Sequence, residues 1–383
     1  MASTVALVRC DTYDTDAVHE AVGRGLGLLG GAGRFVSAGE HVLLKPNLLV
    51  ASSPTAAVTT HPAVFGAVAR HLLAAGAQLS YGDSPGVGRP EGAARRAGLA
   101  EVADAIGIPF ADFTHGREIS APQGRVVKRW FIAEGVLAAD AVASLPKMKT
   151  HALTRMTGAV KNTFGCIPGA RKGEFHARMP DIERFAQMLV DLCVAVAPRL
   201  YVMDGIVAME GNGPRGGDPR PVGVLLLSTD PVALDAVACR LMGLDPARIE
   251  TVTLGHASEL GSWEEIELLG DPIEESVVTD FVANRRRQST TGPASGTARW
   301  LARQLVVPRP VIDPGRCTRC GTCVEVCPVE PKAVDWVSDP GGRRTRPPEH
   351  DYAACIRCYC CQEMCPERAI DVSVPLLGRI IHR

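Results

Sequence analysis

Aromatic side chains are scarce in this chain of 383 residues, and neither sign of charge dominates it. Phe, Trp and Tyr make up 5% of the residues, and the formal net charge is −1. This balance argues against a basic nucleic-acid-binding protein. No apolar run is long enough to span a membrane, because Asp191, Asp230 and Asp235 interrupt the best candidates. The first residues lack a basic n-region and a twin-arginine signal, so we expect a cytoplasmic protein with no nucleic-acid or membrane partner.

Nucleotide-binding motifs are missing as well. Nothing matches G-x4-G-K-[ST], which argues against a P-loop. The glycines between Gly23 and Gly30 have a spacing near that of a dinucleotide-binding loop, but they follow a helical pattern rather than a strand. We therefore expect no bound nicotinamide or flavin.

Cysteine is concentrated in the last quarter of the chain. The stretch from Cys317 to Pro328 reads CTRCGTCVEVCP, and the stretch from Cys355 to Pro366 reads CIRCYCCQEMCP. Both follow C-x2-C-x2-C-x3-C-P, in which three thiolates of one loop bind one 4Fe-4S cluster and the fourth binds a second cluster. Two copies therefore predict two 4Fe-4S clusters.

The same spacing assigns the ligands by a cross-over rule. One cluster is expected on Cys317, Cys320, Cys323 and Cys365, and the other on Cys355, Cys358, Cys361 and Cys327. Zinc is the competing interpretation. A zinc site does not need three equally spaced cysteines followed by a fourth cysteine and Pro, and this pattern occurs twice. Disulfides are disfavoured because no export signal accompanies the eight thiols. The segment resembles bacterial two-cluster ferredoxins, and Cys360, which matches no ligand position, is interpreted as an extra thiol near a cluster.

Short β-rich runs alternate with longer helical runs from residue 4 to about 280. The predicted strands are 5–10, 41–49, 78–83, 141–148, 199–207 and 222–229, and the predicted helices are 61–77, 181–197 and 230–244. Thr60 and Asp230 are the expected N-caps of two of these helices. The alternation predicts an α/β domain with a mostly parallel sheet flanked by helices, followed by a small α+β ferredoxin-like iron-sulfur domain. The expected divisions are 1–282 for the α/β domain, 283–307 for a linker, 308–375 for the two-cluster domain and 376–383 for a tail.

Polar residues follow several predicted strands, at the sheet edge where ligands bind in parallel sheets. The clusters are 45–47, 82–86, 204–205 and 228–230, and together they predict the rim of a pocket, although each alone is typical of a turn. The segment 145–181 adds seven Lys and Arg residues and two His, with Glu174 as its only acid before Asp181. Glycines interleave with these cations, so we expect a site for a carboxylate, a phosphate or an acidic cofactor, with a helix N-terminus near Thr150. The alternative is a solvated basic face, or one that docks an acidic electron donor.

Long blocks of this sequence resemble the domain of unknown function 362 family. The blocks are LLKPNLL, TTHP, YGDSPG, LPKMKTHALTRMTGAVKNTFGCIPG, MDGIVAMEGNGP and LLLSTDPVALDAVA, and they occur in order. The resemblance implies an iron-sulfur protein of that family with no settled reaction, and an appended two-cluster ferredoxin is familiar there. It places importance, without roles, on Lys45, Asn47, His61, Asp83, Lys147, Lys149, His151, Lys161, Asn162, Gly165, Asp204, Glu210, Asp230 and Asp235.

Residue types suggest roles for several of these positions. Lys149, His151 and His176 are the candidate catalytic residues, since imidazole titrates near neutral pH, although either His could instead be structural. The candidate substrate- or anion-binding residues are Lys45, Asn47, Asp83, Lys147, Arg155, Lys161, Asn162 and Asp204. An additional metal ion is expected only if the fold brings together Asp83, Asp204, Glu210 and Asp230. Cys166 is the non-cluster thiol in the most interesting place, whereas Cys10, Cys193 and Cys239 are expected in the core.

Two functions are open at this point. In the first, the protein is an iron-sulfur oxidoreductase whose clusters relay electrons to an anionic small-molecule substrate or cofactor in the α/β domain. Its electrons come from an external donor such as a ferredoxin or a flavodoxin reductase system. In the second, it is an electron-transfer or cofactor-binding protein that docks a partner enzyme and has no catalysis of its own. A cavity lined by residues 147–176 close to one cluster favours the first function, and an open basic patch favours the second.

Overall fold

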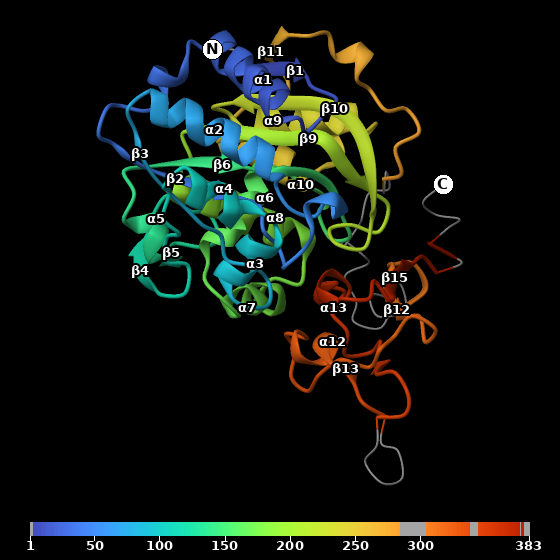
Figure 1. The fold of residues 1–383 in the computed structure, drawn as a ribbon. Helices are drawn as coiled ribbons and strands as arrows, with labels where there is room; N and C mark the ends of the chain where they lie inside the picture. Colours follow the sequence, from blue (N-terminus) through green and yellow to red (C-terminus); the bar gives the residue numbers. More distant parts are fainter. Residues whose placement is uncertain (1–2, 284–303, 338–343, 376, 379–383) are drawn as a thin grey trace.

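The computed structural model describes residues 3–283, 304–337, 344–375 and 377–378. The α/β domain forms the larger lobe, and the cysteine-rich segment from β12 to β15 forms a smaller lobe beside it (Figure 1). Nearly all of the expected linker and most of the expected tail lie outside the described residues.

One mixed sheet organises the α/β domain, and most of its strand pairs are parallel. Its order is β11 (Ile266–Gly270), β1 (Ser3–Arg9), β10 (Asp218–Ser228), β9 (Leu200–Glu210), β6 (Ala141–Leu145), β2 (His41–Pro46) and β3 (Gln78–Tyr81), with β7 (Lys147–His151) and β8 (Arg155–Thr157) attached at β9. The parallel pairs are β9–β6, β6–β2, β2–β3, β7–β9 and β1–β11. In contrast, β10 is antiparallel to both of its neighbours, β1 and β9. The predicted α/β class is therefore confirmed.

Helices cover both faces of this sheet. In β2, Leu43 points into the core beneath α8 (Ile182–Val196) and α9 (Pro231–Leu241), while Val42 and Leu44 point into the core beneath α1 (Thr15–Leu28) and α2 (Pro62–Ala74). Alternate side chains of a strand face opposite sides, so a strand buried on both sides reads as a continuous apolar run. The remaining elements of the domain are α3 (Pro90–Arg96), α4 (Leu99–Ala105), a hairpin of β4 (Gly116–Ser120) and β5 (Arg129–Ala133), α5 (Glu134–Leu137), α6 (Ala159–Asn162), α7 (Arg171–Arg178), α10 (Glu250–Ala257) and the 3-10 turns Ala32–Arg34, Pro54–Ala56, Thr163–Cys166, Pro246–Arg248 and Ile273–Glu275.

One predicted N-cap is confirmed and the other is wrong. Asp230 caps α9, because its carboxylate accepts hydrogen bonds from the backbone N–H groups of Val232 and Ala233. The cap of α2 is His61 instead of Thr60. The Thr60 hydroxyl accepts a bond from Asn47 N–H at 2.8 Å and donates one to the Leu145 carbonyl at 2.6 Å, so it ties together the ends of β2 and β6.

Two further expectations concern glycines and a helix start. The stretch Gly23–Gly30 falls in and just beyond α1, which agrees with the helical pattern there. The expected helix N-terminus near Thr150 is wrong, since Thr150 lies inside β7. The helix in that segment, α6, begins later, at Ala159.

The cysteine-rich lobe is built from short elements. β12 (Arg309–Ile312) pairs with β15 (Ile370–Ser373), β13 (Val334–Asp335) pairs with β14 (Glu349–His350), and the helices are α12 (Thr322–Glu325) and α13 (Cys360–Met364). The α13 segment contacts the turn between β9 and β10. Gln362 donates to Asn212 at 2.9 Å, and Arg215 donates to the Met364 carbonyl at 2.6 Å. These bonds hold one face of the lobe against the α/β domain.

Candidate functional site

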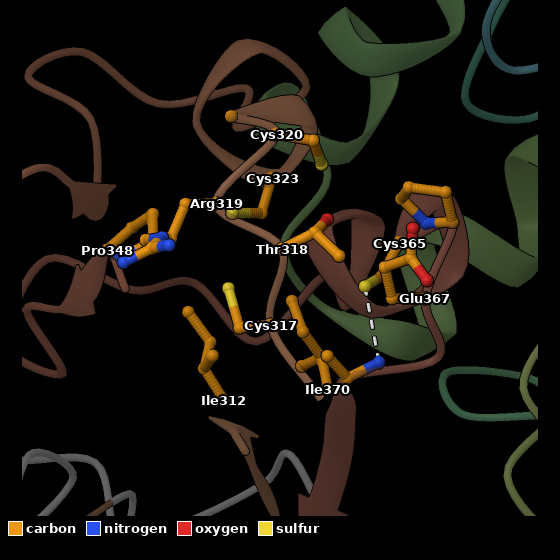
Figure 2. Close-up of a pocket in the computed structure, with 13 residues that line it drawn as sticks. Ile312, Cys317, Thr318, Arg319, Cys320, Cys323, Pro348, Cys365, Glu367 and Ile370 are labelled. Atoms are coloured by element: carbon orange, nitrogen blue, oxygen red, sulfur yellow. Dashed lines mark hydrogen bonds between the residues drawn. The ribbon is translucent and has the colours of Figure 1, made fainter. Parts of the chain in front are cut away.

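Eight thiols surround two small cavities in the cysteine-rich lobe. Cluster site I is lined by Cys317, Cys320, Cys323 and Cys365, whose side chains surround one space (Figure 2). Cluster site II is lined by Cys327, Cys355, Cys358 and Cys361. In each site the fourth cysteine of one motif joins the first three of the other, which is the division that the cross-over rule predicts.

Both motifs adopt the same local backbone. Arg319 and Gly321 have φ values of 60° and 85°, and the corresponding residues Arg357 and Tyr359 have φ values of 63° and 64°. Left-handed residues at these places turn each loop around its thiols. The two loops are therefore shaped alike for the same task.

The donor set fits a polynuclear cluster better than a single ion. Within the described residues, no three His, Cys, Asp or Glu side chains converge closely enough to hold one metal ion. A zinc ion needs sulfurs about 2.3 Å from one point, whereas a 4Fe-4S cluster needs four thiolates spread around its own volume. Four thiols around each cavity meet the second requirement.

The remaining cysteines behave differently from the eight. Cys166 is fully buried in the main core, near the charges of Lys45, Asp83 and Lys172, and burial raises the pKa of its thiol to about 12. Cys10, Cys193 and Cys239 are buried as predicted. Cys360 is buried beside the cluster ligand Cys358 and faces the cavity described next.

A cavity of about 670 Å³ lies between the α/β domain and the cysteine-rich lobe, and we call it the interdomain cavity. One wall is formed by the loops that follow β2 and β3 and by the segment from α6 to α7. The other wall is formed by Glu325–Pro328 and by residues of α13. Cys327 and Pro328 line both this cavity and cluster site II. The cavity therefore adjoins a cluster ligand.

Four lysines line the interdomain cavity. Lys332, on the side of the cysteine-rich lobe, pairs with Glu330 at 2.9 Å. The three lysines of the α/β wall form no ion pair with a carboxylate among the described residues. Lys149 Nζ donates to Asn47 Oδ1 and to the Val58 carbonyl, both at 2.7 Å. Lys172 Nζ donates to Ser84 Oγ at 2.8 Å and to the Ile167 carbonyl at 2.8 Å.

The third lysine, Lys161, has its ammonium group 5.8 Å from the centre of the Phe164 ring. Burial lowers the pKa of all three lysines, to about 7 for Lys172. An anion in the cavity would offset this burial by restoring a countercharge.

His176 also lines the interdomain cavity. Its ring stacks on Phe185 at 4.4 Å and lines the cavity, while its buried Nδ1 has no hydrogen-bond partner within the described part of the chain. Burial lowers the pKa of His176 to about 3, so the ring is neutral near pH 7. Of the two roles considered for His176, the neutral ring favours hydrogen bonding over acid or base catalysis near neutral pH.

Polar residues at the ends of β2 and β3 support the lysines. Lys45 forms a fully buried ion pair with Asp83 at 2.7 Å. Asn162 accepts bonds from Asn47 at 3.2 Å and from Lys45 at 3.4 Å. Asn47, Asp83 and Asn162 reach the cavity wall, whereas the Lys45 ammonium is neutralised behind it. The sequence predicted that these residues would lie at one site. Lys45, however, is neutralised by Asp83, so its charge is not available to bind an anion.

Lys147, Arg155 and Asp204 lie outside the cavity lining, so the expected single anion site does not contain them. Lys147 pairs with Asp204 at 2.7 Å, and Asp204 also accepts a bond from Tyr13 at 2.8 Å. Arg155 pairs with Glu250 in the core. Their charges serve buried ion pairs.

His151 also lies behind the cavity wall. Its Nδ1 accepts backbone bonds from Leu153 and Thr154, which places the proton on Nε2. Nε2 lies 3.2 Å from Glu363 Oε1 of α13, although the alignment is too poor for a hydrogen bond. Burial lowers the pKa of His151 well below its ordinary value, which favours the structural role over an acid or base role for this residue too.

The four carboxylates considered for an additional metal are not brought together. Asp83 pairs with Lys45, Asp204 with Lys147, and Glu210 with Arg220, while Asp230 caps α9. Two other residues highlighted by the resemblance, Asp235 and Gly165, have structural roles. The Asp235 carboxylate accepts bonds from the first N–H groups of α6, and a Cβ at Gly165 would lie 1.8 Å from Asp83 Oδ1.

Comparison with known proteins gives the family. A model described as "Domain of unknown function (DUF362)" matches residues 42–240, which is more than half of the chain. The chain belongs to the DUF362 family. A second model, described as "4Fe-4S dicluster domain", matches residues 309–366. This DUF362 protein thus carries two 4Fe-4S clusters, and such a domain implies electron transfer.

One curated relative is the "Thylakoid-associated protein sll1697" of Synechocystis sp. (strain ATCC 27184 / PCC 6803 / Kazusa), 41% identical over 253 residues that cover 66% of this chain and 78% of that protein. Among solved structures, the lactate racemase apoprotein from Thermoanaerobacterium thermosaccharolyticum has a TM-score of 0.41 at 9% identity, covering 63% of this chain and 57% of that one. A Thermotoga maritima protein has a TM-score of 0.35 at 10% identity, covering 65% and 60%. The chain spans less than two thirds of both structures, and likeness at this level is no evidence of shared activity.

No helix among the described residues is long and apolar enough to cross a bilayer.

Sequence reasoning missed several residues of the cavity, among them Lys172 and Glu363. Lys172 stands in the predicted basic segment but was not selected from it, because nothing local distinguishes it from Arg171 or Arg178. Glu363 comes from the cysteine-rich lobe, and only the packing of α13 against the α/β domain brings it to the wall.

Proposed function

We propose that this protein is an iron-sulfur oxidoreductase that passes electrons from cluster site II to an anionic small molecule bound in the interdomain cavity. The observation that carries the proposal is the shared lining. Cys327 and Pro328 border both the cluster site and a cavity whose opposite wall holds three lysines without carboxylate partners. An anion held by these lysines would sit between the basic wall and the cluster.

The chemistry balances for a carbonyl or alkene acceptor. The two clusters would supply one electron each. With two protons, an acceptor that takes these two electrons would lose its π bond and become an alcohol or a saturated carbon pair. Lys172, with a pKa of about 7, can donate one proton near neutral pH, and solvent supplies the other. Neutral His176 would hold an oxygen of the acceptor by a hydrogen bond. Lys149 and Lys161 would stabilise negative charge that develops during the transfer.

Electrons would enter at cluster site I. Cys320 is exposed and Cys317 is half-buried, whereas three of the four thiols of cluster site II are buried. Among the described residues, none that lines cluster site I also lines the interdomain cavity, whereas Cys327 and Pro328 of cluster site II do. An external donor such as a ferredoxin or a flavodoxin reductase system would therefore dock on that side of the lobe.

The alternative is a carrier that docks a partner enzyme through a basic face. That function needs the lysines on an open surface. Lys149 is only 1% exposed, and Lys161 and Lys172 face a space bounded by two domains. This placement favours the oxidoreductase.

The test uses anaerobically purified, reduced full-length protein and a panel of 2-oxo acids and α,β-unsaturated carboxylates. We expect at least one acceptor to reoxidise the clusters with saturable kinetics, followed by absorbance. Lys161→Met removes a charge-assisted contact of about 1.5–3 kcal/mol, so it should weaken the apparent affinity about tenfold or more with unchanged iron content. Lys128→Met, at an exposed lysine away from the cavity, is the matched control.

Reoxidation that rises linearly with acceptor concentration and is equal in Lys161→Met and wild type would overturn the proposal. It would show that the acceptor meets the clusters from solvent without using the cavity.

A further inference from the structure

A second cavity continues from the interdomain cavity. It has a volume of about 590 Å³ and shares Ser84, Gly88 and Gly169 with the first. A Cβ added at Gly88 or at Gly169 would meet nothing within 4 Å, so the space beside both residues is open. The backbone at this junction is therefore bare and accessible to a ligand that extends from one cavity into the other.

The second cavity is basic. Arg89 and Arg95 line it, and neither guanidinium forms an ion pair within the described residues. Glu91 is the acid in the lining, so two cations face one carboxylate. Thr114 adds a hydroxyl, and Ser84 in the shared wall carries the Lys172 ammonium group 2.8 Å from its Oγ. The positive charge thus continues from the lysines of the first cavity.

The loop that leads into Arg89 and α3 is suited to an anion. Residues 82–88 read GDSPGVG and follow β3, at the edge of the sheet where ligands bind in parallel sheets. Gly88 has a φ of 84°, a left-handed conformation that favours glycine. Bare backbone next to two guanidinium groups can approach an oxyanion closely.

We propose that Arg89 and Arg95 form a second anion subsite that binds a phosphoryl group. Two guanidinium forks and a hydroxyl offer more donors than the two oxygens of a carboxylate can use, whereas a phosphoryl group has three terminal oxygens and a charge near −2. The second half of the inference rests on the proposed function: the ligand is elongated, with its reducible end beside cluster site II and its phosphoryl group at Arg89 and Arg95.

Isothermal titration of the anaerobic holoprotein with inorganic phosphate tests the subsite. We expect phosphate to bind in both cavities. Arg89→Ala and Arg95→Ala should each weaken one of the two binding events by about tenfold or more, and Lys161→Met should weaken the other. Arg96→Ala is the matched control, since Arg96 is exposed on the same helix but does not line the cavity. Unchanged phosphate binding in both arginine variants, or no saturable binding to wild type, would overturn the subsite.

Inorganic tripolyphosphate tests the bridging ligand. If one elongated anion spans both cavities, tripolyphosphate binds once per chain and is weakened by Arg95→Ala and by Lys161→Met alike. Two independent binding events, each sensitive to one variant, would refute the elongated ligand. Neither titration requires electron transfer, so failure of the subsite and failure of the oxidoreductase can be told apart.

Discussion

Lys172 gives the interdomain cavity a pH dependence that can be measured. Its ammonium group donates to two carbonyl groups and to the Ser84 hydroxyl, and no carboxylate lies within ion-pair distance. Burial lowers its pKa to about 7. The lysine is therefore charged below about pH 7 and neutral above it, and only the charged form attracts an anion.

The sign and the size of the effect follow from this pKa. Below about pH 7 Lys172 is already charged, so the affinity for an anion should not change with pH. Above it, binding must be accompanied by uptake of a proton, which costs about 1.4 kcal/mol, or a factor of about ten in affinity, for each pH unit. Lys172→Met should weaken binding at pH 6 by about 1.5–3 kcal/mol and should reduce the slope that begins near pH 7. Any slope that remains comes from Lys149 and Lys161, whose pKa values burial also lowers.

Sulfate is the suitable probe, because its own charge is constant through this range. Isothermal titration from about pH 6 to about pH 8.5 would compare wild type, Lys172→Met and the exposed control Lys128→Met. Sulfate bound at Arg89 or Arg95 adds no slope, since guanidinium groups remain charged. A wild-type affinity that is flat through pH 8, or an equal slope in Lys172→Met, would refute the reasoning.

Two further predictions concern the clusters and the fold. Cys355→Ala removes one of the four ligands of cluster site II and should lower the iron content by about half. Cys166→Ala, at a core thiol, should leave the iron content unchanged. Full iron content in Cys355→Ala would contradict the ligand assignment. Asp204→Asn leaves the Lys147 ammonium unpaired where the two side chains are 0% and 1% exposed, so chemical denaturation should show a free energy of unfolding lower by about 3–5 kcal/mol. A loss below about 1 kcal/mol would mean that this ion pair is not a buried one.

Local patterns predicted the cluster sites and the sheet. Cysteine spacing determines which thiols one loop can present, so both sites could be assigned without the fold. The strands could be read from their apolar runs, and the ends of β2 and β3 did bring Asn47 and Asp83 to one cavity. These predictions depended on neighbours in sequence or on a general property of parallel sheets.

The sequence could not predict which Lys and Arg side chains form buried ion pairs and which remain available to bind an anion. Lys147 and Lys149 are two residues apart in one strand, yet Lys147 pairs with Asp204 while Lys149 faces the cavity. Arg155 is neutralised by Glu250, which is 95 residues away in the sequence. Which cation stays available depends on partners that only the fold brings close. The histidines show the same limit, because burial lowers their pKa values.

The central claim is that the anion in the interdomain cavity lies against cluster site II. An anion there makes it harder to add an electron to that cluster, so it must lower the cluster's reduction potential. The most direct measurement is a redox titration, followed by electron paramagnetic resonance, with and without saturating sulfate. It would compare Cys317→Ala, which keeps cluster site II, with Cys355→Ala, which keeps cluster site I. We predict that sulfate makes the potential of cluster site II more negative and leaves that of cluster site I nearly unchanged, and that Lys161→Met abolishes the shift. Equal shifts at both clusters, or none at cluster site II, would contradict the account.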